Sequence, residues 1–65
     1  MTDAGWERLV QSVLAEIEPA PVARAALREK LRQRGDLELL YGLWCQGGDA
    51  GWLSRILARL ARNVR

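Results

Sequence analysis

Three short junctions divide the chain into four segments in which apolar residues recur at every third or fourth position. The junctions are a proline corner at 19–21, a Gly-Asp pair at 35–36 and a Gly-Gly-Asp run at 47–49. Apolar residues at this spacing are typical of amphipathic α-helices, and strand-forming residues are few, with four valines, two isoleucines, one threonine and no phenylalanine. We therefore predict an all-α fold, a compact bundle of three to four short helices joined by tight Gly/Pro/Asp turns, in a single small helical domain over residues 1–65.

The first two predicted helices meet at the proline corner. The first begins after Asp3, because an aspartate side chain accepts hydrogen bonds from the free amides of a first helical turn, and Pro19 ends it. The second begins at Pro21, where proline is tolerated, and runs to about Arg34, followed by Gly35 as the C-terminal cap. The first apolar stripe is Trp6, Leu9, Val10, Val13, Leu14 and Ile17, and the second, narrower one is Val22, Ala23, Ala26, Leu27 and Leu31.

The third predicted helix, from Leu37 to about Gln46 after an Asp36 cap, is apolar on more than one face. One face holds Leu37, Leu40, Tyr41 and Trp44, and another holds Leu39 and Leu43. A helix that is apolar nearly all round belongs in the middle of an assembly. We therefore expect neighbouring helices to cover one face and a partner to cover the other.

Asp49 is expected to cap the fourth helix, which runs from Ala50 to about Asn63. Its apolar stripe is Trp52, Leu53, Ile56, Leu57, Leu60 and Val64, with the arginines beside or opposite it. The sequence Asp-Ala-Gly-Trp occurs at 3–6 and again at 49–52. Since the match ends directly after the tryptophan, it indicates the same capping device at two helix starts rather than a duplication.

Residues 37–61 resemble one tetratricopeptide hairpin, with Leu40-Tyr41-Gly42-Leu43-Trp44 in the first helix and Gly48-Asp49 at the turn. The resemblance covers less than half of the chain, and the later alanine and proline positions of that repeat are not matched. One such unit cannot bury its own apolar face. The resemblance therefore implies two antiparallel helices here, and no binding residues are carried over from it.

The chain lacks the residues on which most catalytic sites depend. It has no histidine and only one cysteine, so catalytic sets that combine histidine with serine or cysteine are excluded. The glycines at 47–51 precede a helix, but Asp49 occupies the place where an anion would bind. We predict no enzymatic activity, no catalytic residue, no cofactor and no metal, and we interpret Cys45 as a small buried side chain rather than a reactive or linking thiol.

Neither a secretory leader nor a membrane span is expected. The first residues, Met1-Thr2-Asp3, have no basic or apolar region of the kind that leaders carry, and apolar runs are only two or three residues long. A membrane-spanning helix needs about 20 apolar residues. The expected location is therefore cytoplasmic.

Arginines at helical spacing form two rows, called ridges, one on the second and one on the fourth predicted helix. The net charge is only +2, but residues 50–65 carry four arginines and no acid. At helical spacing, side chains three or four residues apart lie on the same face. Such ridges are either solvated faces or contacts for an acidic protein surface, a nucleic-acid backbone or an anionic lipid. The ridges are Arg24, Arg28 and Arg32 in the second helix and Arg55, Arg59 and Arg62 in the fourth.

Large apolar side chains are numerous for so short a chain: eleven leucines, four valines, two isoleucines, three tryptophans, one tyrosine and one methionine. A small bundle has little interior, so some of them must lie at a surface or an interface. We predict a small non-catalytic helical protein–protein interaction module of the adaptor, co-chaperone, inhibitor or docking type. It would dock an apolar and aromatic helix face with an arginine rim on a partner protein or on a second copy. The candidate interface residues are Trp6, Leu39, Leu43 and Trp52.

Two other functions fit parts of the sequence. The alternative is a small nucleic-acid-binding regulatory protein that uses both arginine ridges, although a charge of +2 is low for binding phosphates alone. A third possibility is an interfacial cationic helix at a membrane surface, formed by residues 51–62.

Overall fold

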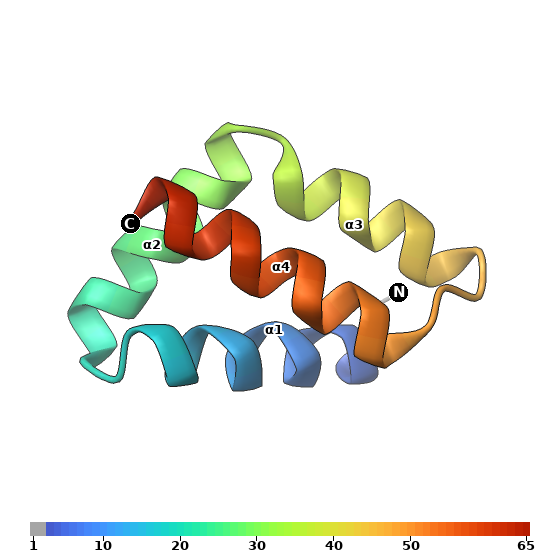
Figure 1. Cartoon of the computed structure of the whole chain (residues 1–65), viewed down its shortest axis with the longest axis horizontal. Helices are drawn as coiled ribbons and strands as arrows, with labels where there is room; N and C mark the ends of the chain where they lie inside the picture. The colour runs from blue at the N-terminus through green and yellow to red at the C-terminus, as the bar shows by residue number, and fades with distance from the viewer. Residues whose placement is uncertain (1–2) are drawn as a thin grey trace.

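The computed structural model describes residues 3–65, which form four α-helices and no strand. The all-α prediction is thus confirmed. The helices are α1 (Ala4–Ile17), α2 (Pro21–Gln33), α3 (Asp36–Cys45) and α4 (Ala50–Val64). In Figure 1, α4 crosses the middle of the bundle between α1 and α3, and α2 lies across the left end, beside the C-terminal part of α4. Because α4 contacts all three other helices, its apolar side lies at the centre of the core.

The core is formed mainly by one face each of α1 and α4. The predicted stripe of α1 is confirmed, with five of its side chains buried and Leu9 packed partly against them. The predicted stripe of α2 is too wide, because Val22 in its first turn is 85% exposed and only two of its side chains are buried. The buried residues are Trp6, Val10, Val13, Leu14, Ile17, Leu27, Leu31, Leu37, Leu40, Leu53, Leu57 and Ala61.

Both Asp-Ala-Gly-Trp sequences begin a helix in the same way. The Asp3 carboxylate accepts a hydrogen bond from the backbone N–H of Trp6 (3.1 Å), and the Asp49 carboxylate accepts one from the backbone N–H of Trp52 (2.8 Å). The two predicted caps are therefore confirmed, but the surroundings of the two tryptophans differ. Trp6 is 8% exposed, whereas Trp52 is 44% exposed.

The first cap also joins α1 to α3. The second carboxylate oxygen of Asp3 accepts a hydrogen bond from the indole Nε1–H of Trp44 at 2.5 Å. Trp6 packs against Tyr41 and Trp44, with ring centroids 5.7 and 6.0 Å apart. The hydrogen bonds from Trp6 and Trp44 lower the pKa of Asp3 below its ordinary value.

The lowered pKa of Asp3 predicts a pH dependence of stability. A carboxylate whose pKa falls on folding stabilises the fold above its ordinary pKa of 3.8, and this contribution is lost as the pH falls through the lower pKa of the folded state. The variant Asp3→Asn has one carbonyl oxygen for the two donors and no titrating group. In thermal melts between neutral and acid pH, we expect the wild type to be more stable than this variant at neutral pH and the difference to shrink in acid. A difference that does not change with pH would contradict this role of Asp3.

Glycines form the turns on either side of α3. Gly35, with φ of 82°, ends α2 and is also the N-cap of α3. The prediction that Asp36 caps α3 is therefore wrong: Asp36 is the first helical residue, and its carboxylate accepts a hydrogen bond from Arg34 Nε at 3.1 Å. At the other end, Gly47 has φ of 90°. Its N–H donates to the Trp44 carbonyl and that of Gly48 to the Leu43 carbonyl, a Schellman turn that leads into α4.

The helix α3 is covered on more of its surface than its sequence suggests. Leu37 and Leu40 are buried, and Tyr41, Leu43 and Trp44 are partly buried against the core, so Leu39, at 65% exposure, is the one fully open leucine of this helix. Of the second predicted face, Leu39 is exposed and Leu43 is partly buried, so this face is narrower than predicted, and a partner that covers it stays a prediction. Within residues 3–65, no helix is both long and apolar enough to cross a membrane.

Candidate docking surface

The arginine ridge of α2 is used within the fold. Arg24 donates to the backbone carbonyls of Glu18 (3.1 Å) and Pro19 (2.7 Å) at the end of α1. Arg28 Nη2 donates to both carboxylate oxygens of Glu7 on α1, at 2.6 and 2.9 Å. These contacts explain the spacing of Arg24 and Arg28 without any external partner.

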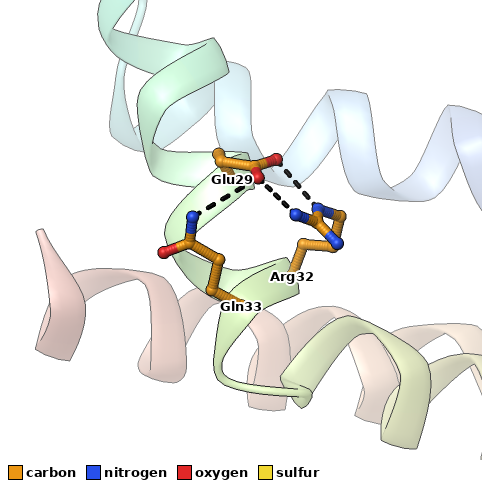
Figure 2. A network of polar contacts seen from close by, with 3 residues as sticks. All are labelled: Glu29, Arg32 and Gln33. Atoms are coloured by element: carbon orange, nitrogen blue, oxygen red, sulfur yellow. Dashed lines mark hydrogen bonds and ion pairs between the residues drawn. The ribbon is translucent and has the colours of Figure 1, made fainter.

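The third arginine of this ridge is paired within α2. Figure 2 shows Arg32 and Gln33 donating to the carboxylate of Glu29, and the Arg32 Nε bond is 2.9 Å long. Arg32 lowers the pKa of Glu29, and Glu29 raises the pKa of Arg32. Since both side chains are exposed, the pair contributes little to stability, but it neutralises the charge of Arg32.

The arginine ridge of α4 is unpaired. Arg55, Arg59 and Arg62 are exposed, and they form no ion pair or side-chain hydrogen bond with any residue of the described chain, 3–65. The fourth arginine of this segment, Arg65, lies apart and pairs with Glu18 at 3.2 Å. At positions i, i+4 and i+7, the three free guanidinium groups follow one face over about 10 Å of helix.

These arginines line a shallow groove of about 650 Å³ beside α1. Trp52 and Ile56 of α4 contribute apolar surface to the groove, and Val13 and Glu16 line it from α1. Trp52, Arg55, Ile56, Arg59 and Arg62 are called the α4 surface below. It combines one exposed indole with three unpaired cations.

The other predicted interface residues lie elsewhere. Trp6, predicted as an interface residue, is buried between α1 and α3, against Tyr41 and Trp44, and is therefore not open to a partner. Leu39 and Leu43 lie on α3 and do not line the groove. Of the four predicted contacts, only Trp52 joins the arginines.

Cys45 is exposed, so its interpretation as a buried side chain is wrong. It is the last residue of α3 and lies beyond the part of the helix that packs on the core. Its side chain raises the pKa of Tyr41, one turn earlier.

Sequence reasoning missed the α1 side of the groove. Val13 belongs to the predicted core stripe of α1, and no sequence pattern indicates that it and Glu16 share a groove with α4. Their role depends on how α1 packs beside α4, which no local pattern specifies. Ile56 had a detectable signal, because it follows Trp52 by four residues and lies on the same helix face.

The two ridges are expected to respond differently to mutation. Arg28→Ala breaks the contact between α1 and α2, and we expect a loss of about 1 kcal/mol in the free energy of unfolding, at the upper end for partly exposed pairs. Arg59→Ala removes no internal contact, and we expect a change within about 0.5 kcal/mol. Urea denaturation of both variants measures the difference. A larger loss for Arg59→Ala than for Arg28→Ala would contradict this division.

Residues 3–65 contain no group of three or more cysteine, aspartate, glutamate or histidine side chains placed to hold a metal ion. The α4 surface offers an aromatic contact and three cationic hydrogen-bond donors. Comparisons of the chain with protein-family models, with curated proteins and with solved structures give no match.

Proposed function

We propose that the chain is a small non-catalytic protein-interaction module that docks through its α4 surface on a partner protein. The observation that carries this proposal is the contrast between two arginine ridges of similar spacing. The ridge on α2 is taken up by internal contacts, whereas the ridge on α4 is unpaired and lies beside the half-exposed Trp52. Tryptophan and arginine are the residues most enriched among those that dominate binding energy at protein interfaces.

Nucleic-acid binding has less support from the same residues. Internal contacts engage the three arginines of the α2 ridge, so of the two ridges it is that of α4 which is unpaired within residues 3–65, and Glu16 lines the groove that it borders. Affinity for nucleic acid depends on how many phosphates are neutralised, and a carboxylate in the groove repels phosphate. A protein partner can instead place a cation or a hydrogen-bond donor opposite Glu16.

Insertion of α4 into a membrane surface has less support as well. An interfacial helix must turn its apolar face toward the lipid. In this fold that face holds Leu53, Leu57 and Ala61, all 0% exposed in the core. Insertion would therefore require the bundle to open.

The proposal is tested by comparing two surface variants of the full chain as affinity baits in an extract of the source organism. Trp52→Ser alters the α4 surface, and Leu39→Ser is the matched control on α3, where another exposed apolar side chain is removed. A protein retained by the wild type is identified, purified and titrated against each variant by calorimetry. We expect Trp52→Ser to weaken the purified complex about tenfold or more and Leu39→Ser to leave it unchanged.

Two results would overturn the proposal. One is a purified complex that Leu39→Ser weakens and Trp52→Ser does not, which would place the interface on α3. The other is the absence of any purified protein that binds the wild-type chain. Sedimentation of the wild type alone shows whether the partner is a second copy, in which case Trp52→Ser is expected to make the chain monomeric.

A further inference from the structure

We infer that the segment bound by the α4 surface is an acidic amphipathic α-helix of the partner protein. This inference rests on the proposed function and specifies the chemistry of its partner. It is carried by charge complementarity: an unpaired stripe of three guanidinium groups beside an apolar strip.

The charges specify an acidic stripe on the partner. The helix α4 contains no acidic residue, and Arg55, Arg59 and Arg62 form no ion pair within residues 3–65. Every α-helix rises about 1.5 Å per residue. Carboxylates at i, i+4 and i+7 of a helix lying along α4 are therefore spaced along its axis like the three arginines. Each guanidinium can then bind one carboxylate through two parallel hydrogen bonds.

The apolar residues specify a second stripe beside the acidic one. Trp52 and Ile56 are one turn apart and border the groove at the N-terminal part of α4. A partner helix with leucine or isoleucine next to its acidic positions can cover both side chains while its carboxylates face the arginines. From Trp52 to Arg62 the surface extends about 15 Å, which corresponds to roughly three helical turns.

The α1 side of the groove carries a negative charge opposite the positive charges of α4. Glu16 is exposed and has no ion pair within the described residues, and it lines the groove that the α4 arginines also line. A helix that is acidic on one flank and carries a lysine on the other satisfies both sides. Nucleic acid and anionic lipid present negative charge throughout and cannot provide the cation for Glu16.

The test uses synthetic helices of 15 residues, the length of α4. The first peptide carries glutamates at i, i+4 and i+7, leucines on the adjoining stripe and one lysine beyond them. The second replaces the three glutamates with lysines. Both are titrated into the ¹⁵N-labelled full chain, with the Trp52 indole and the α4 amides as NMR reporters, beside oligodeoxythymidine and phosphatidylglycerol vesicles as separate probes.

We expect the acidic peptide to bind and to shift the signals of Trp52 and α4, and the lysine peptide not to bind. In the variant Arg55→Glu/Arg59→Glu/Arg62→Glu, affinity for the acidic peptide is expected to fall by about 30-fold or more and binding of the lysine peptide to appear. If reversal of charge in the last turns weakens the helix, the variant Arg55→Gln/Arg59→Gln/Arg62→Gln is used instead, with circular dichroism as the check on folding. This variant is expected to lose its affinity for the acidic peptide without binding the lysine peptide. Glu16→Lys is expected to weaken acidic-peptide binding because the lysine of the peptide then meets a like charge.

Several results would overturn this inference. One is that the acidic peptide does not bind, and another is that it binds the wild type and the triple variant with equal affinity. A third is that oligodeoxythymidine or the vesicles bind through the same arginines more tightly than the acidic peptide does. The proposed function is judged separately by the purified complex and its dependence on Trp52. If that dependence holds while the acidic peptide fails, the surface docks a protein and only the assignment of an acidic helix is wrong.

Discussion

Replacement of Leu57 by alanine is expected to lower the free energy of unfolding by about 2–5 kcal/mol. Leu57 is 0% exposed and lies in the middle of α4, the helix that contacts all the others. A single core in a domain this small rarely provides more than about 3–5 kcal/mol. We therefore expect the variant to be largely unfolded without denaturant, with most of its helical circular dichroism lost.

The control for this prediction is Leu39→Ala, which is the same chemical change at a side chain that is 65% exposed. Because Leu39 is not part of the core, we expect its urea midpoint to stay close to that of the wild type, within about 0.5 kcal/mol. Similar losses in the two variants would mean that α3 and α4 do not pack as described.

Gly48→Ala is expected to destabilise the chain by about 1–3 kcal/mol, the range for an added methyl group in a packed site. A Cβ atom at Gly48 would lie 2.8 Å from the carbonyl oxygen of Leu43 and 3.1 Å from a methyl carbon of Leu53. That carbonyl accepts the hydrogen bond from the Gly48 N–H. Relief of the clash would therefore loosen the turn that leads from α3 into α4.

Gly42→Ala provides a control of opposite sign. Gly42 lies inside α3, and a Cβ atom there would meet nothing within 4 Å. Because alanine favours the helix over glycine, we expect a gain of about 0.5–1 kcal/mol. The melting temperatures of the two variants should shift in opposite directions. A lower melting temperature in both would show that Gly42 is needed in α3 for a reason other than helix propensity.

The helices and their ends could be predicted from the sequence because their determinants are local. Asp3 and Asp49 each accept a hydrogen bond from the residue three positions later, and Gly35 and Gly47 take the positive φ that helix ends favour. The core stripe of α1 also followed from its spacing. The misplaced cap at Asp36 has a local reason, since only Arg34 and Gly35 separate α2 from α3 and Gly35 already takes the N-cap position of α3.

The surface could be predicted only in part, because exposure depends on packing between helices. Trp6 and Trp52 occupy the same position in the same four-residue sequence, yet one is buried against α3 and the other borders a groove. In the same way, the two arginine ridges have similar spacing. The paired ridge differs from the free one in the position of Glu7 opposite Arg28 and of the end of α1 beside Arg24, and in the local pair of Arg32 with Glu29.

Photo-crosslinking within the source organism shows whether the α4 surface is the docking site that we propose. A photoreactive phenylalanine analogue replaces Trp52, Leu39 or Val22 in turn, three exposed apolar residues that lie on three different helices. We predict a covalent adduct with a partner protein from position 52 and none from position 39 or 22. Adducts from position 39 or 22 with none from position 52 would show that the partner docks on another surface than that of α4.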